Sequence, residues 1–521
     1  MRKKVLFGYS KIYYCLLILL FNQLCLGQNK FPYFNTGQSE QGFIKIDAKT
    51  NDLPTPNLIT FSPDGIKLVD GGSQQAAVAL DALSFSTDKG FILEFEFGLD
   101  LGSSNPGDGI AMVLFDASIT TPAMGVKGSG LGYAHARRTT GGHLKGFLGG
   151  FLGLGLDLYG NYKNVMSDTK ETRNGIIDGK DEPSGTGGGN YVVLRGPAGP
   201  LNTEGYPVLF GINTNVNSNY YLDKSSGDRE KRQKGFEGQR FEIKGGKHNV
   251  GPGDPAYRKA IISLVKGKDD VNNSTDGFFI SVDMLHGVYK SSVIKNYFIP
   301  TTGTIRYREL VTAGSTTVTT KTLAISVPTE LKMAFTGSTG GASIRAHIRN
   351  IALSLPFSPV ANDMSVQGVL VDAPSTIKPL YLAFGYNSNV YSVLNPPIKS
   401  FLYLEKKSFR FKRYDPVSKQ PVLTPDSYTL NEPGTGIFKY DENTGEITFT
   451  PETGFQGDVP YTFYYDIKNV KPASGTDIST EEYRSRTAAI TLNFVKKGTG
   501  VDAYPTIIVN RGLKNTKELK P

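Results

Sequence analysis

Apolar residues in this chain fall in short alternating runs, and no long stretch repeats them at the i, i+3, i+4 and i+7 spacing of a helix. In the run from Gly90 to Phe97, the residues at odd positions are large and apolar and share one face, while Ile92, Glu94 and Glu96 share the other. The 60 glycines and 29 prolines, with abundant Thr, Ser, Tyr and Phe, suit short strands joined by tight turns. The sequence therefore predicts an all-β fold.

The length of 521 residues leaves room for two or three domains, each with its own core. Strand-like runs recur through the first part of the chain, and pairing between distant runs fits one large jelly-roll sandwich over residues 28–355. Prolines with small polar neighbours would interrupt a strand ladder at 356–362, so we place a linker there. A smaller sandwich over 363–498 and a polar tail over 499–521 complete the predicted organisation.

Residues 1–27 read as a signal peptide rather than as part of the fold. Basic residues precede an apolar run from Cys15 to Leu20, and the small residue Gly27 suits a cleavage site. A membrane anchor is the alternative, but the run contains Asn22 and Gln23 and is too short to span a bilayer. We expect no membrane span after cleavage, and a secreted or cell-surface protein.

The mature chain carries little net charge and no thiol. Cleavage after residue 27 removes four basic residues and no acids, so the formal charge falls from +9 to +5. The basic cluster from Lys224 to Lys234 is interleaved with acids, which indicates a solvated loop rather than a nucleic-acid interface. Both cysteines, Cys15 and Cys25, leave with the signal, so the mature chain has no disulfides.

Three short signatures lie in a fixed order between Gly107 and Asn161. They combine flexible glycine turns and oxygen-bearing side chains with runs that read as buried strands: Gly-Asp-Gly-Ile-Ala at 107–111, Gly-Gly-Phe-Leu-Gly-Leu at 149–154 and Asp-Leu-Tyr-Gly-Asn at 157–161. Such an array can hold a hard cation with carboxylate and amide oxygens and offer its remaining groups to a polyol.

With further motifs in the same order, these signatures resemble the bacterial form of the L-type (legume-type, concanavalin-like) lectin domain over residues 33–355. The further motifs are Val-Val-Leu-Arg-Gly at 192–196, Gly-Tyr-Pro at 205–207, Asp-Pro-Ala-Tyr-Arg-Lys at 254–259, Ala-Phe-Thr-Gly-Ser-Thr-Gly-Gly at 334–341 and His-Ile-Arg-Asn at 347–350. Residues 436–466, which include a predicted hairpin, resemble the Ig-like or fibril-type repeats of bacterial surface adhesins, whose role is that of a spacer. The resemblance implies a lectin or adhesin that binds glycans or glycoconjugates and is not an enzyme.

The resemblance also implies the site residues. Asp108 would follow a cis peptide and accept hydrogen bonds from sugar hydroxyls; taken alone, Asp108-Gly109 favours an ordinary turn, but the buried strand and the other motifs favour the sugar contact. The ring of Tyr159 would stack on a sugar face and the amide of Asn161 would donate to the sugar. Glycines that bring backbone close to the ligand complete the implied carbohydrate site: Gly149, Gly150, Gly340 and Gly341.

A calcium ion is the implied cofactor. Asp157 would give carboxylate oxygen, Tyr159 its backbone carbonyl and Asn161 its side-chain carbonyl, with Asp168 as the nearest candidate for a second carboxylate. Ordinary turn-capping and packing roles remain the alternative for Asp157 and Tyr159. The chain departs from the legume pattern at Gly155, where that pattern places a glutamate for a transition metal, so we expect no transition metal.

Two other classes of function stay open. A glycoside hydrolase on the same sandwich needs two carboxylates facing one cleft, and Glu94 and Glu96 are the best candidates. A structural surface protein with a degenerate lectin domain is the third reading. The sequence leaves open which sugar is bound, and also the oligomeric state, since sandwiches of this kind pair through sheet edges or backs.

Overall fold

A computed structural model describes residues 31–50, 53–54, 58–81, 83–101, 106–137, 143–163, 189–215, 236–245, 247, 249–269, 275–310, 318–391, 396–496, 506–508 and 511–512. The predicted all-β class is confirmed: the described helical elements are short 3-10 turns, η1 (Gly128–Gly130), η2 (Phe401–Tyr403) and η3 (Glu481–Tyr483). Among these residues there is no helix with the length and apolar content that a bilayer crossing needs. The predicted signal peptide at 1–27 lies outside the described residues.

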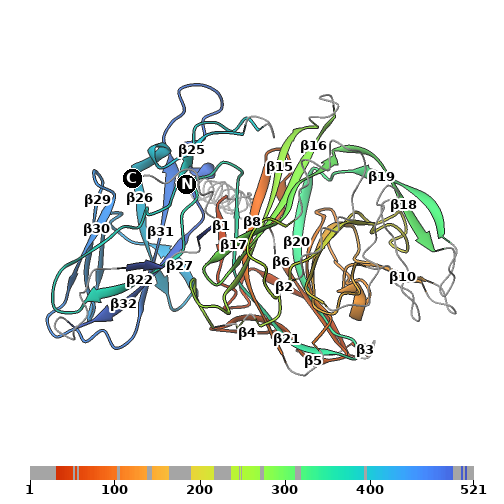
Figure 1. Ribbon diagram of the computed structural model, residues 1–521, viewed down its shortest axis with the longest axis horizontal. Coiled ribbons are helices and arrows are strands. Elements are labelled where there is room, and N and C mark those ends of the chain that lie inside the picture. The colour runs from red at the N-terminus through yellow and green to blue at the C-terminus, as the bar shows by residue number, and fades with distance from the viewer. Residues whose placement is uncertain are drawn as a thin grey trace, which may run out of the picture.

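The first sandwich consists of two nine-stranded sheets, which we call the near sheet and the far sheet by their distance from the C-terminal sandwich (Figure 1). In spatial order the near sheet contains β34 (Arg511–Gly512), β17 (Tyr289–Pro300), β16 (Asp276–His286), β15 (Arg258–Lys268), β8 (Gly90–Leu101), β21 (Ser343–Ser354), β5 (Gly65–Gly72) and β4 (Thr60–Ser62), with β1 (Tyr33–Asn35) paired to β21.

The far sheet contains β14 (Val208–Asn213), β13 (Tyr191–Arg195), β12 (Gly150–Asp157), β9 (Gly109–Asp116), β20 (Glu330–Ser338), β6 (Gln74–Leu80), β2 (Phe43–Thr50) and β3 (Leu53–Pro54), with β7 (Phe85–Ser86) paired to β20. Two ribbons lie outside these sheets: β10 (Ala136–Arg137) with β11 (His143–Leu144), and β18 (Thr302–Leu310) with β19 (Val318–Ser326).

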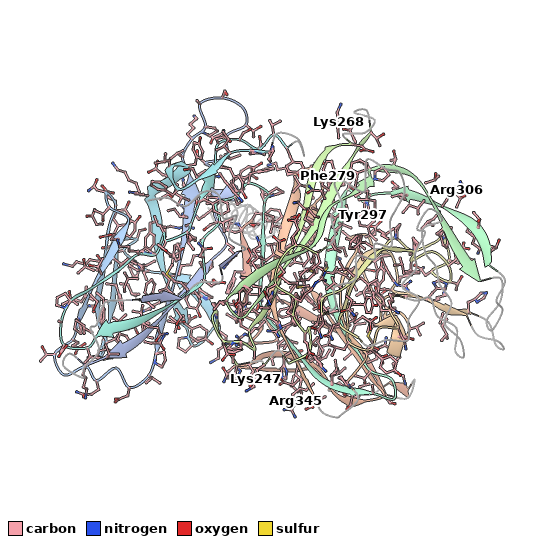
Figure 2. All side chains as sticks on the ribbon, in the orientation of Figure 1. Lys247, Lys268, Phe279, Tyr297, Arg306 and Arg345 are labelled. Atoms are coloured by element: carbon pink, nitrogen blue, oxygen red, sulfur yellow. The ribbon has the colours of Figure 1, made fainter. Side chains whose placement is uncertain are left out.

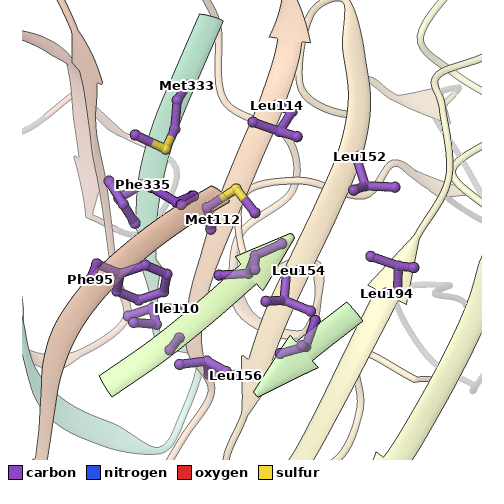
Figure 3. Close-up of a cluster of buried hydrophobic side chains, with 14 of the residues drawn as sticks. Phe95, Ile110, Met112, Leu114, Leu152, Leu154, Leu156, Leu194, Met333 and Phe335 are labelled. Carbon is purple, nitrogen blue, oxygen red and sulfur yellow. The ribbon is translucent and has the colours of Figure 1, made fainter. Parts of the chain in front are cut away.

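Side-chain alternation explains why the far sheet is buried on both faces. In β9, Ile110, Met112 and Leu114 belong to the core between the two sheets, which Phe95 of the near sheet also enters (Figure 3). The residues between them, such as Val113 and Phe115, belong to a second core between the far sheet and the loops that cover it. The continuous apolar run of β9 therefore has no solvent-facing side, as its sequence predicts.

The C-terminal sandwich has its own core. A six-stranded sheet contains β27 (Gln420–Leu423), β26 (Leu404–Asp415), β31 (Tyr461–Asn469), β32 (Ala488–Val495), β22 (Met364–Leu370) and β33 (Thr506–Ile508). A four-stranded sheet contains β23 (Ser375–Ile377), β30 (Glu446–Pro451), β29 (Gly436–Asp441) and β28 (Thr429–Glu432), and β24 (Gly385–Tyr386) pairs with β25 (Lys399–Ser400). The predicted hairpin is the β29–β30 pair. Two parts of the predicted polar tail are strands, β33 and β34, and β34 pairs with β17 of the first sandwich.

The outer face of the near sheet packs against the C-terminal sandwich (Figure 1). Lys259 of β15 contacts Glu94 of β8 at 2.6 Å and Asp363 at 2.9 Å. Arg486 contacts the same two carboxylates at 2.7 and 2.8 Å. Charges of opposite sign thus alternate around a mostly buried ring of four side chains, and each carboxylate touches cations from both sandwiches.

Four labelled basic side chains of the first sandwich lie at different edges of it. Figure 2 places Lys268 and Arg306 at one edge of this sandwich and Lys247 and Arg345 at another. Arg345 forms an ion pair with Asp70 at 3.0 Å. Arg306 lies on β18, in the ribbon outside the two main sheets.

Candidate functional site

Strand register brings the first and third signatures, and the closing loop, to one end of the far sheet. Gly109, at the start of β9, lies opposite Asp157 of β12 on one side and opposite Ser338 of β20 on the other. Asp108, the segment from Asp157 to Asn161 and the loop from Ser338 to Gly341 are therefore neighbours, although 232 residues separate Asp108 from Gly340 in sequence.

Backbone hydrogen bonds hold Asp108 in this position. The Gly107–Asp108 peptide is cis, as the resemblance implies. The amide of Asp108 donates to the Ser338 carbonyl at 3.2 Å, and the amide of Leu158 donates to the Asp108 carbonyl at 2.8 Å. Gly340 donates its amide to Oδ2 of Asp108. The side chain is 6 % exposed, so its carboxylate sits at the floor of the loop cluster rather than on a projecting loop.

Asp157 is fully buried directly beside Asp108. Its Oδ1 accepts the amide of Gly160 at 2.7 Å and its Oδ2 accepts the amide of Tyr162 at 2.7 Å, so the carboxylate closes the loop that follows β12. Burial raises the pKa of Asp157 to about 6, against the lowering effect of these amides. Burial, reinforced by the charge of Asp157, raises the pKa of Asp108 to about 7.

The groups above these two carboxyls are open. Tyr159 is 45 % exposed. The amide of Asn161 is half-buried and has no hydrogen-bond partner within the described parts of the chain. A Cβ added at Gly341 would meet no atom within 4 Å, whereas one added at Gly340 would lie 3.1 Å from Oδ2 of Asp108. Tyr159 and Gly341 are thus accessible on the two loops beside the buried carboxylate of Asp108, and Asn161 follows Tyr159 on the same loop.

The structure does not bring Gly149 and Gly150 to this end of the sheet. Gly150 lies opposite Phe115 at the far end of β9, roughly 20 Å along β12 from Asp157 at the usual rise per residue. A Cβ at Gly149 would lie 2.6 Å from Ile119, and one at Gly150 would lie 2.8 Å from the ring of Tyr133. These glycines accommodate packing in the covering loops.

A different glycine turn, which the sequence argument missed, lies beside Asp108. Gly128, in η1, donates its amide to Oγ of Ser338 at 2.7 Å, and a Cβ there would lie 3.6 Å from Oδ2 of Asp108. Its φ of +70° is in the region that favours glycine. The Gly-Ser-Gly pattern at 128–130 was the available signal, but sequence spacing alone does not show which glycine turn folds back to Asp108.

Packing explains why Gly155 replaces the glutamate of the legume pattern. A Cβ at Gly155 would lie 2.3 Å from ring carbons of Tyr162, and one at Gly153 would lie 2.4 Å from the ring of Tyr133. Both rings are fully buried on this face of β12. The space that a metal-binding side chain at 155 would need is filled by an aromatic ring.

The donor groups suit a hard cation in kind, but the described residues do not make a complete site. Asp157, the Tyr159 carbonyl and Asn161 all offer oxygen, which calcium prefers. No group of three or more His, Cys, Asp or Glu side chains able to hold a metal occurs in the described ranges. Asp168, the expected second carboxylate, lies outside the described residues.

The two carboxylates considered for catalysis are engaged in ion pairs under the C-terminal sandwich. Burial alone would raise the pKa of Glu94, but Arg486 and Lys259 together hold it below its usual range. Glu96 accepts from Arg349 at 2.7 Å and from the hydroxyl of Tyr257 at 3.1 Å. Glu94 is thus held as an anion, whereas a retaining glycosidase needs one protonated carboxyl as general acid.

Glu96 also lines a cavity of about 330 Å³ between the two sandwiches, together with Asp363. Burial alone would raise the pKa of Asp363, but Arg486 and Lys259 hold it well below its usual range. Asp363 is thus held as an anion by two cations, and Glu96 is paired with Arg349.

Comparisons with known proteins give fold-level likenesses only. No protein-family model matches the chain, and no curated protein matches it. Among solved structures, the VIP36 exoplasmic/lumenal domain in its Ca²⁺/Man3GlcNAc-bound form is 11 % identical, with 62 % of this chain and 86 % of that chain covered and a TM-score of 0.28. The Lotus tetragonolobus seed lectin is 11 % identical, with 62 % and 97 % covered and a TM-score of 0.32.

Peanut lectin with a bound 9mer peptide is 13 % identical, with 63 % of this chain and 99 % of that chain covered and a TM-score of 0.29. At these identities and TM-scores the likeness carries no inference about what this chain binds.

Proposed function

We propose that this protein is an exported carbohydrate-binding protein and that its glycan site is the loop cluster around Asp108. The observation that supports the proposal most directly is that the buried carboxylate of Asp108 lies next to a loop that carries an exposed tyrosine ring and an asparagine side chain. Asp108 is fixed by backbone hydrogen bonds, while the next loop carries Tyr159, which is 45 % exposed, and the half-buried Asn161. A polyol needs such a set, in which acceptor, donor and apolar surface are fixed together.

Each group has a separate part in the proposed site. Oδ2 of Asp108 already accepts from Gly340, so Oδ1 is the atom left to accept sugar hydroxyls. Asn161 donates its amide, and the ring of Tyr159 packs on the apolar face of the sugar. Gly128 and Gly341 leave room for backbone to approach the ligand, and Gly340 orients the carboxylate. Gly149 and Gly150 are not part of this site because they lie at the other end of β12.

Calcium belongs to the proposal as a support of the loop rather than as a ligand of the sugar. Asp157, the Tyr159 carbonyl, Asn161 and Asp168 would hold the ion, which supplies positive charge beside two buried carboxyls. Since Asp157 already accepts two amides, the loop has a metal-independent closure as well. The ion would therefore tighten an existing loop and not create it.

A glycan array probed with the full mature chain, with calcium and with EGTA, tests the function. Binding without turnover supports a lectin. Release of shortened glycans would instead establish a hydrolase, and absence of binding to every glycan class would favour a structural surface protein. The full chain is the correct material because the C-terminal sandwich covers the near sheet.

A further inference from the structure

Arg195 is a fully buried arginine on β13, and it holds the carbonyls of two separate loops. Its Nε and Nη2 donate to the carbonyl of Tyr162 at 3.0 and 2.6 Å, and its Nη1 donates to the carbonyl of Tyr206 at 2.7 Å. The guanidinium also lies over the ring of Tyr162, 4.8 Å from its centroid. A planar cation with fixed donors suits this double contact, whereas a lysine has one rotating ammonium group.

The first loop is the one that carries Tyr159 and Asn161. The backbone of Tyr162, at the end of this loop, is held at both of its polar groups. Its N–H donates to Oδ2 of Asp157, and its carbonyl accepts from Arg195. Asp157 and Arg195 lie on adjacent strands, β12 and β13, which pair in register. The loop is therefore anchored at its start by a carboxylate and at its end by a guanidinium.

The second loop leads to the glycine turn beside Asp108. Tyr206 donates its hydroxyl to the Phe147 carbonyl at 2.8 Å and packs edge-on against Tyr133. Tyr133 donates to the carbonyl of Gly196, the residue after Arg195, at 2.8 Å. The backbone of Tyr133 is bonded to Gly130 of η1. Arg195 thus holds the loop of Asn161 directly, and it reaches the turn of Gly128 through Tyr206 and Tyr133.

We propose that Arg195 is a positioning residue for the glycan site: it fixes the Tyr159–Asn161 loop relative to Asp108 without touching the sugar. This inference rests on the proposed function. It also accounts for the Arg-Gly and Gly-Tyr-Pro motifs at 195–196 and 205–207, which the site itself does not use. Their residues form the clamp between the two loops and not a ligand surface.

The test compares Arg195→Lys and Arg195→Met with Tyr162→Phe in the full mature chain. Tyr162→Phe is a matched control because it keeps the carbonyl that Arg195 holds and removes a buried hydroxyl with no hydrogen-bond partner in the described part of the chain. We expect Arg195→Met to weaken glycan binding by about 10–100-fold, as loss of an orienting partner does elsewhere. The glycan affinity of Arg195→Lys should lie between those of Arg195→Met and the parent. Tyr162→Phe should bind glycan as tightly as the parent does.

Hydrogen exchange separates positioning from general destabilisation. In Arg195→Lys, the amides of Gly160 and Tyr162 should exchange faster while the amides of β9 and β20 keep their protection. Acceleration spread evenly over the far sheet, or glycan affinity equal to that of the parent, would overturn the inference. If the parent itself binds no glycan, the proposed function fails, and the exchange pattern still decides whether Arg195 fixes the loop. If Arg195→Met does not fold, glycan binding and hydrogen exchange are both measured on Arg195→Lys.

Discussion

Asp108 and Asp157, two neighbouring buried carboxyls, tie the stability of the protein to pH. Their pKa values are raised to about 7 and about 6 from an ordinary value of 3.8. Because the folded state favours the protonated forms, this stabilisation is complete below about pH 4 and is lost as the pH rises through 6 and 7. We expect the protein in EGTA to melt at a lower temperature at pH 8 than at pH 5.

The variant Asp108→Asn should remove the larger part of that pH dependence, since an amide does not ionise. An equal pH dependence in this variant and in the parent would show that other groups cause it. The measurement is a series of thermal melts of the full chain at constant ionic strength.

Calcium should restore the folding stability that is lost at high pH, because the ion binds the ionised form of a carboxylate. At free calcium about 100 times its dissociation constant, the expected gain is about 2.7 kcal/mol. The rise in melting temperature should be larger at pH 8 than at pH 5, and Asp157→Asn should blunt it. Manganese should give no separate effect. A melting temperature that changes with neither EGTA nor calcium would show that the hydrogen bonds from the amides of Gly160 and Tyr162 to Asp157 hold the loop without a metal.

The sequence motifs placed Asp108 and Asp157 in one predicted site, and the two residues are neighbours in the fold. They lie together because Asp108 directly precedes β9, Asp157 ends β12, and the two strands pair in register. The glycines were harder to assign, because a Gly-Gly pair suits close packing and close ligand approach equally well. In the fold, Gly149 lies against Ile119 and Gly150 against Tyr133, which indicates close packing rather than ligand approach. The sequence does not show these contacts.

At the scale of elements, β12 depends on glycines that leave room for aromatic rings from the covering loops. Gly155→Ala would place a Cβ 2.3 Å from the buried ring of Tyr162. We expect a loss of about 1–3 kcal/mol in the free energy of unfolding, the usual cost of overpacking. Gly341→Ala is the matched control, with no atom within 4 Å of the added Cβ. Denaturant unfolding of both variants measures the difference, and equal stabilities would contradict this account of the strand.

β8, with unbroken alternation, and β9, with a continuous apolar run, were predictable from the sequence, whereas β17 was not. In β17 the pairing with β16 shifts register twice, and Asn296 has a φ of +53°. The alternation of apolar residues is interrupted there, so no single face reads as buried. Tertiary contacts, including a hydrogen bond of the Asn296 amide to Oγ of Ser281, hold this irregular strand in the near sheet.

At the scale of the whole molecule, the ring of four charges should make the two sandwiches unfold together. Lys259→Met would leave Glu94 and Asp363 with Arg486 as the remaining cation of the ring. Breaking a buried pair in this way typically costs about 3–5 kcal/mol. Lys378→Met is the control, since Lys378 pairs with Glu446 on the surface and should cost at most about 1 kcal/mol. Calorimetry should show one transition for the parent; two independent transitions would contradict the coupling.

The sequence predicted two β-sandwiches but not their association. A proline-containing linker and a spacer-like repeat suggested separate units, and nothing in the run from Gly90 to Phe97 showed what the face of Glu94 and Glu96 contacts. Whether a charged strand face meets water or another domain depends on residues far along the chain, here Asp363 and Arg486. The back of the near sheet is therefore occupied by the C-terminal sandwich.

The most direct test of the central claim is a binding titration of the full mature chain with a glycan found on the array. Asp108→Asn keeps the shape of the side chain and removes its charge, and Asp116→Asn makes the same change at the other end of β9. We expect Asp108→Asn to weaken binding by about 10–100-fold, the value of a hydrogen bond to a charged group. Asp116→Asn should bind as the parent does. Equal affinity for the parent and Asp108→Asn would show that the glycan site lies elsewhere.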